Sequence, residues 1–192
     1  MLRFFNNNRA PCEPAPAMGT DFTSFCHSIS SPALRAVTLH WDRVRGARKM
    51  PSWQDLQPKA FAPYLPLVWA YKFDAESQEF VGRLAGDCIA RAYGKSFRGL
   101  TLAQIHTSPD RYQAARAMLL RVILEPAIFL GHGRIFQLKE EFRSGERIVL
   151  PLSSDGIVGD GVFGATEAGA LPIAHQPVQG FNDVGHWHSL KV

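Results

Sequence analysis

The sequence predicts an α+β fold, in which helices connect two groups of antiparallel strands. Two short runs of strand-forming residues, 67–73 and 80–85, lie before the middle of the chain and are joined by a polar segment. Helical patterns then extend over 89–124, and strand patterns return between 127 and 166. We therefore expect one antiparallel sheet whose two halves are linked by a helical layer.

The composition indicates one globular domain. The 192 residues are 46% hydrophobic and 20% charged, as is usual for globular proteins, and no run approaches the roughly 18 apolar residues of a membrane span. The three cysteines form no CxxC pair, which favours a reducing compartment over a disulfide framework. The first residues lack the pattern of a secretory signal, so we expect a cytoplasmic protein.

The charge of the chain is mildly basic and does not indicate a nucleic-acid partner. The formal net charge is +4, and the one concentration of cations covers residues 43–49. Cations near a helix C-terminus complement the helix dipole, so a solvated helix end explains this cluster. We do not expect nucleic-acid binding.

The first predicted element is an amphipathic helix within 32–50, whose helical period runs to about Arg45. Ser31 can cap this helix, and Pro32 suits its first position. The preceding residues, 1–31, show no apolar period and are expected to be a disordered or loosely attached tail. Apolar residues recur along one narrow stripe of the helix, as in a helix that packs on a single surface: Leu34, Val37, Trp41 and Val44.

This stripe predicts a homodimer. Residues 89–124 already supply a helical layer, so the stripe must cover the outer face of its own sheet or the same helix of a second copy. A symmetric dimer buries such a patch against itself across a two-fold axis. We expect Trp41, a large aromatic residue near the middle of the stripe, to anchor this interface.

A proline-rich connector and two strands follow. Residues 51–66 contain four prolines and read as a connector. The run 67–73 is dense in β-forming residues, and 80–85 alternates between two faces. The segment 74–78 between them is polar and short, as a hairpin connection requires.

The helical layer is predicted in pieces. A first turn at 89–93 stops at Gly94, and a second short piece covers 100–105. A longer helix begins after Thr107, ends at 125–126, and carries an apolar face made of Ala115, Met118, Leu119, Val122 and Ile123.

The last third of the chain reads as strands joined by turns at 144–145 and 154–156. Residues 127–130 form a short apolar run, and the three strands predicted after it are 135–142, 147–153 and 162–166. Residues 168–192 return to glycine, proline, histidine and glutamine and are expected to be a second tail. We therefore expect the folded domain to cover residues 51–167, between the N-terminal helix and the C-terminal tail.

Five short motifs carry a resemblance to a known family. In chain order they are Leu39-His40-Trp41-Asp42, residues 45–52 with Asp55, Leu65-Pro66, Arg83-Leu84-Ala85-Gly86 with Gly94 and Gly99, and Pro151-Leu152-Ser153 with Asp155-Gly156. Over residues 33–167 this order resembles a compact bacterial family of PAS domains, first catalogued as a domain of unknown function. The resemblance implies a five-stranded antiparallel sheet with helices over one face and a pocket between them. It also implies a sensory or interaction module that is usually dimeric. No reaction is established for that family, so the resemblance implies no catalytic residues.

The expected function is therefore non-enzymatic sensing through a small apolar ligand, a protein partner or both. No kinase, cyclase or DNA-binding domain fits beside the PAS-like segment, so we expect a separate output protein. The sequence requires no cofactor or metal and predicts no catalytic residues. A mostly apolar pocket is expected to involve Leu84, Ile89, Tyr93, His106, Tyr112, Met118, Phe136, Leu138, Leu150 and Leu152. Of these, Leu84, Leu150 and Leu152 should face the helical layer.

Two other functions remain open at this point. His106, or the histidines His186 and His188 of the C-terminal tail, could bind haem or a metal ion. A small α+β enzyme acting on an apolar substrate would need a buried acid–base pair, and no suitably placed pair is evident in the sequence. Cys88 lacks the Asn-Cys-Arg-Phe-Leu context of light-sensing flavin PAS domains and is expected to be a structural thiol.

Overall fold

The computed structural model describes residues 21–138, 141–172 and 184–190, and all structural statements below concern these residues. A six-stranded antiparallel sheet lies at the centre of the protein, with the strand order β2-β1-β5-β4-β3-β6. The strands are β1 (Val68–Asp74), β2 (Glu79–Ala85), β3 (Ala127–Leu138), β4 (Glu141–Leu152), β5 (Gly161–Pro172) and β6 (Val184–Ser189). The α+β class is thus confirmed, with six strands where the sequence predicted five.

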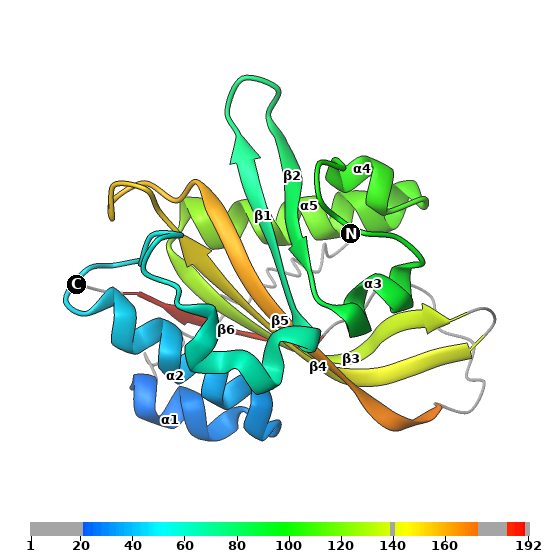
Figure 1. Ribbon diagram of the computed structural model, residues 1–192, viewed down its shortest axis with the longest axis horizontal. Helices are drawn as coiled ribbons and strands as arrows, with labels where there is room; N and C mark the ends of the chain where they lie inside the picture. Colours follow the sequence, from blue (N-terminus) through cyan, green and yellow to red (C-terminus); the bar gives the residue numbers. More distant parts are fainter. Residues whose placement is uncertain (1–20, 139–140, 173–183, 191–192) are drawn as a thin grey trace, which may run out of the picture.

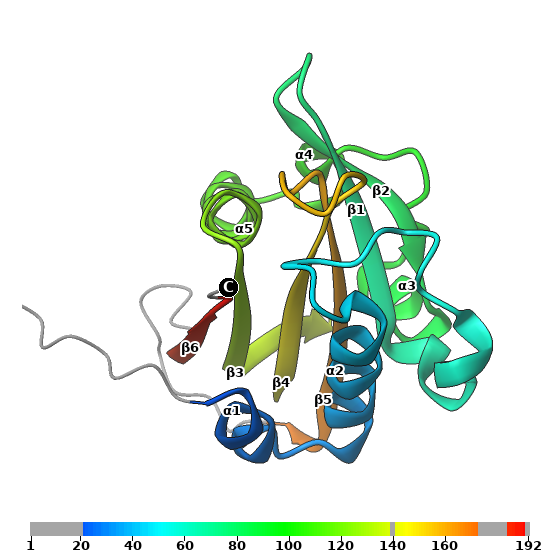
Figure 2. The ribbon, with the colours of Figure 1, turned by 90° about the vertical axis from the view of Figure 1, so that its left-hand side faces the viewer.

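The helices form two separate groups (Figures 1 and 2). The first group is α1 (Phe22–Ser28), α2 (Pro32–Arg45) and the 3₁₀ segment η1 (Pro58–Leu67), and the second is α3 (Asp87–Tyr93), α4 (Leu102–Ile105) and α5 (Pro109–Leu124). Each group packs on a different face of the sheet and has its own hydrophobic core. The helices between β2 and β3 thus lie over one face, as the resemblance implied, and the N-terminal helices cover the other face. In the part of the chain that the structure describes, no helix combines the length and apolarity needed to cross a bilayer.

Helix α2 begins and ends as its sequence predicts. The Ser31 hydroxyl accepts a hydrogen bond from the Leu34 backbone N–H at 3.0 Å, and Pro32 occupies the first turn. Gly46, at a φ of 58°, follows the last helical residue, Arg45, because a left-handed conformation is easily adopted only by glycine.

The apolar stripe of α2 packs on the sheet of the same chain. Leu34, Val37 and Trp41 are 0% exposed, and Val44 is partly buried against the same core. The Trp41 indole N–H also donates to the Pro151 carbonyl at 3.0 Å. This corrects the prediction of a homodimer interface at these residues, because the second apolar face of the sheet already covers the stripe.

The two faces of β4 are opposite to those predicted. Ile148, Leu150 and Leu152 belong to the core beneath α1 and α2, whereas Val149 belongs to the core beneath α3, α4 and α5. Successive side chains of a strand point to opposite faces, and β4 is apolar on both. Alternation alone therefore could not tell which helical group covers which face, and the prediction for Leu150 and Leu152 is corrected.

The turn predicted at 144–145 lies inside β4. Leu138 pairs with Glu141 at the start of the β3–β4 hairpin, and Gly145 pairs with Gly133 of β3. A Cβ atom at Gly145 would lie only 2.3 Å from the Glu167 carbonyl oxygen of β5. This glycine therefore reflects close approach of neighbouring backbones and not a turn.

Both predicted tails contain ordered elements. Helix α1 lies within 1–31 and buries Phe25 and Cys26, while residues 1–20 lie outside the described part of the chain. At the other end, β5 continues to Pro172, and β6 pairs with β3. A seven-residue helix and a six-residue strand are too short to show a clear hydrophobic period.

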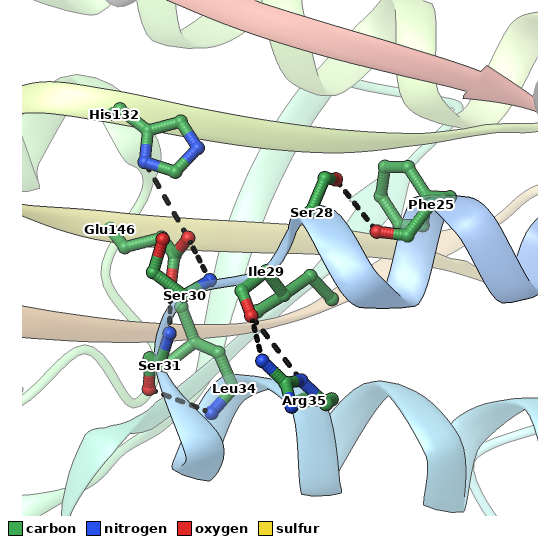
Figure 3. A network of polar contacts seen from close by, with 9 residues as sticks. All are labelled: Phe25, Ser28, Ile29, Ser30, Ser31, Leu34, Arg35, His132 and Glu146. Atoms are coloured by element: carbon green, nitrogen blue, oxygen red, sulfur yellow. Dashed lines mark hydrogen bonds and ion pairs between the residues drawn. The ribbon is translucent and has the colours of Figure 1, made fainter.

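A buried carboxylate attaches the start of α2 to the sheet (Figure 3). Glu146 of β4 accepts hydrogen bonds from the backbone N–H groups of Ser30 at 2.8 Å and Ser31 at 2.6 Å. The His132 ring of β3 lies 3.5 Å from the same carboxylate. Glu146 thus satisfies two N–H groups that have no partner within the helix itself.

Candidate functional site

Two adjoining cavities lie between the sheet and the helices α3, α4 and α5. The smaller one, about 30 Å³, is called the inner cavity below, and the larger one, about 190 Å³, is called the outer cavity. They share lining residues and together form what we call the pocket; the shared residues are Tyr93, His106, Ala115, Met118 and Arg147. The pocket lies in the region where the resemblance predicted one.

The sheet supplies aromatic and polar groups to the pocket. Trp69 and Tyr71 of β1 line the inner cavity, and the Trp69 indole N–H donates to the Thr166 hydroxyl at 2.8 Å. Burial raises the pKa of Tyr71 well above its ordinary value, so its phenol stays neutral. Phe129 of β3 and Trp187 of β6 line the outer cavity, with ring centres 4.8 Å apart.

The helical side of the pocket is mostly apolar. Three α-helices contribute Ile89, Leu102 and Leu119 to the inner cavity, together with Phe97 from the loop after α3. The Tyr93 ring contacts Phe97 edge-on at 5.0 Å and His106 at 5.7 Å. Such a lining is typical of sites for small organic molecules, which combine apolar walls with a few polar groups.

Cations surround the polar end of the pocket. Arg147 of β4 is only 8% exposed and lines both cavities. Burial and, to a smaller extent, the nearby charges of Arg147, Arg111 and Lys95 together lower the pKa of His106 to about 4. His106 is therefore a neutral imidazole at neutral pH, beside a permanently charged guanidinium.

The predicted pocket residues divide into three groups. Ile89, Tyr93, His106 and Met118 line the pocket. Leu84 is 39% exposed on β2, Leu150 and Leu152 lie on the opposite face of the sheet, and the Tyr112 hydroxyl instead donates to Glu79 at 2.9 Å. Phe136 and Leu138 belong to β3, but their side chains fall outside the described part of the structure.

Sequence reasoning missed the polar and C-terminal parts of the pocket. Arg147 carries no predicted role, although a cation directly before the apolar run 148–152 is a detectable signal for a buried polar role. Trp187 was assigned to the tail, and no periodic pattern around it indicated a strand. Trp69 and Thr166 come from strands 97 residues apart, so their pairing required knowledge of the sheet order.

The remaining metal and redox candidates lie away from the pocket. His188 stacks on Phe25 of α1 at 5.0 Å, and the ring centre of His186 is 6.2 Å from that of His132. Within the described ranges, no group of three or more His, Cys, Asp or Glu residues is placed to hold a metal ion. Cys88 does not line either cavity, and its sulfur lies 3.5 Å from Arg91 Nη2.

Comparisons with known proteins give the following similarities. A family model described as a PAS domain matches residues 29–166. A solved structure described as an RNA-binding light-oxygen-voltage receptor is 21% identical, with a TM-score of 0.38. That match covers 53% of this chain and 29% of the receptor chain. The search of curated proteins gives no match.

Proposed function

Because this chain belongs to the PAS domain family, whose members are generally sensory or signalling modules, we propose that it senses a small, mostly apolar ligand. The ligand would occupy the pocket between the sheet and helices α3, α4 and α5. The observation that carries this proposal is the pocket itself, whose walls are aromatic and aliphatic and whose polar groups gather at Arg147 and His106.

We propose that sensing proceeds without a chemical reaction on the ligand. The described lining residues include no aspartate or glutamate, and general acid–base chemistry usually needs a titratable pair near the operating pH. His106, with its pKa lowered to about 4, is poorly matched to proton transfer at neutral pH. The signal would then pass to a separate output protein.

Haem binding is a second candidate function, favoured by the neutral His106 imidazole at the pocket. A neutral imidazole is a suitable iron ligand. The outer cavity of about 190 Å³ is, however, below the roughly 300–1,000 Å³ of pockets that hold drug-sized ligands. A Soret absorbance band in the purified protein, lost in His106→Ala, would favour haem over an apolar ligand.

A homodimer and a cytoplasmic location remain part of this proposal. Because α2 is buried against its own sheet, a dimer would have to use a different surface. Cys26 and Cys88 are both free thiols, which suits a reducing compartment; Cys12 lies outside the described residues. Sedimentation across a dilution series tests the oligomeric state directly.

Filling the pocket tests the proposed function. Ala115 lines both cavities, whereas Ala117 is exposed on the same helix and lines neither. We expect isothermal titration to show that the wild type and Ala117→Trp bind octanoate or 1-octanol. Ala115→Trp should bind them about tenfold more weakly or worse, because overpacking a filled site costs about 1–3 kcal/mol. Absence of binding to the wild type would contradict the proposal.

A further inference from the structure

We infer that the ligand class of this pocket is a small amphiphilic carboxylic acid, with an apolar body against the helices and its carboxylate at Arg147. This inference rests on the proposed function and adds the chemistry that selects the ligand. It depends on the position of one buried cation, on the positive surroundings of the pocket and on the apolar walls.

The buried cation is the first part of the argument. Arg147 is 8% exposed and lines both the inner and the outer cavity. Any molecule that fills the pocket therefore lies beside its side chain. A guanidinium presents several N–H donors in a planar arrangement that matches the two oxygens of a carboxylate.

The surroundings of Arg147 strengthen the preference for an anion. Burial is the main cause of the lowered pKa of His106, and the positive charges of Arg147, Arg111 and Lys95 lower it in the same direction, so cations lie near this end of the pocket. The Lys95 ammonium donates to the carbonyl of Gln104, two residues before His106, at 3.1 Å. No aspartate or glutamate is among the described lining residues to repel a carboxylate.

The rest of the pocket selects an apolar body. Ile89, Phe97 and Met118 surround the inner cavity and offer no hydrogen-bond donors, so they favour hydrocarbon over a polar chain. Trp187 and Phe129 provide a flat aromatic wall in the outer cavity. A ligand with several polar groups would leave some of them unpaired against these walls.

A matched pair of probes tests this inference. Octanoate and 1-octanol share the same chain and differ in the charged group. We expect titration calorimetry at neutral pH to show that the wild type binds octanoate at least about tenfold more tightly than 1-octanol, because a hydrogen bond to a charged group is stronger than one to a neutral group. Arg147→Met should remove this preference, and Arg147→Lys should keep part of it. The exposed Arg98 lines neither cavity, so Arg98→Met is the matched control and should behave as the wild type.

The outcomes separate the two proposals. Equal binding of the acid and the alcohol to the wild type would contradict the carboxylate inference and leave the ligand-sensing function standing. Binding of neither probe would contradict both. If Arg147→Met does not fold, the ratio of the two affinities in the wild type and in Arg147→Lys still decides the question. A preference for octanoate that persists in a folded Arg147→Met variant would also overturn the role of this arginine.

Discussion

His106 keeps a neutral ring in the folded protein at pH values where a solvated histidine is charged. Burial, together with the charges of Arg147, Arg111 and Lys95, lowers its pKa from 6.5 to about 4. Between these two values the unfolded chain binds a proton that the folded chain does not. The free energy of unfolding therefore falls as the pH drops through this window, and it is restored above the unfolded pKa.

Replacing His106 by glutamine should flatten this pH dependence. Between pH values of about 7 and 4.5, we expect the free energy of unfolding of the wild type to fall by about 1–2 kcal/mol more than that of His106→Gln, after a discount for the partial exposure of the ring. Urea denaturation at a series of pH values measures this difference. Parallel profiles for the two proteins would show that His106 is solvated or charged in the folded state.

The residues of the pocket differ in how well the sequence could predict them. Ile89, Tyr93 and Met118 lie in predicted helical segments, whereas His106 was predicted from its place just before the long helix, near the pocket that the resemblance implies. Arg147 could not be predicted in the same way, because the run 148–152 is apolar on both faces and gives no rule for which face the preceding charges, Glu146 and Arg147, each take. The position of Leu150 was mistaken for the same reason.

At the scale of the element, α2 shows the difference between detecting an apolar stripe and knowing what covers it. The spacing of Leu34, Val37 and Trp41 predicted both the helix and its buried face, and these residues are indeed fully buried. The predicted partner was a second copy, whereas the structure shows the chain's own sheet. A second apolar face on the sheet removes the need for an intermolecular contact, and that face is visible only once the strands are ordered.

The hydrogen bonds of Glu146 should account for much of the attachment of α2. Glu146→Gln removes the charge and leaves one acceptor oxygen for two N–H groups, so we expect a loss of about 1–3 kcal/mol in the free energy of unfolding. Glu125→Gln is the matched control, because Glu125 forms an ion pair with Arg121 at the surface and should cost less than about 1 kcal/mol. Chemical denaturation compares the two variants, and equal losses would contradict the buried role of Glu146.

Hydrogen exchange can locate the effect of that substitution. The amides of Ser30 and Ser31 donate directly to Glu146, so their protection should fall most in Glu146→Gln. The amides of α5 lie on the other face of the sheet and should be less affected. Uniform loss of protection over both helical groups would indicate general destabilisation in place of a local detachment.

At the scale of the whole molecule, the sheet is a wall shared by two hydrophobic cores. The α+β class and the order of the elements from α2 to β5 could be predicted because most of these segments have a clear local period. The sixth strand could not, since its residues have no apolar alternation, and its stability comes from pairing with β3. The C-terminal segment nevertheless contributes to both cores, through Trp187 on the pocket side and Leu190 on the α1 and α2 side.

This arrangement predicts that two substitutions near the C-terminus have similar effects on stability and different effects on binding. Trp187 packs against Phe129, and the Arg121 guanidinium lies 4.0 Å from its ring centre; Leu190 is 7% exposed in the opposite core. We expect Trp187→Ala and Leu190→Ala each to lower the free energy of unfolding by about 2 kcal/mol or more. Only Trp187→Ala should also weaken octanoate binding, because Trp187 lines the outer cavity and Leu190 does not. Calorimetric titration of both variants below their unfolding temperatures separates the two effects. Equal weakening by Leu190→Ala would mean that binding responds to the stability of the whole sheet and not to the wall of the pocket.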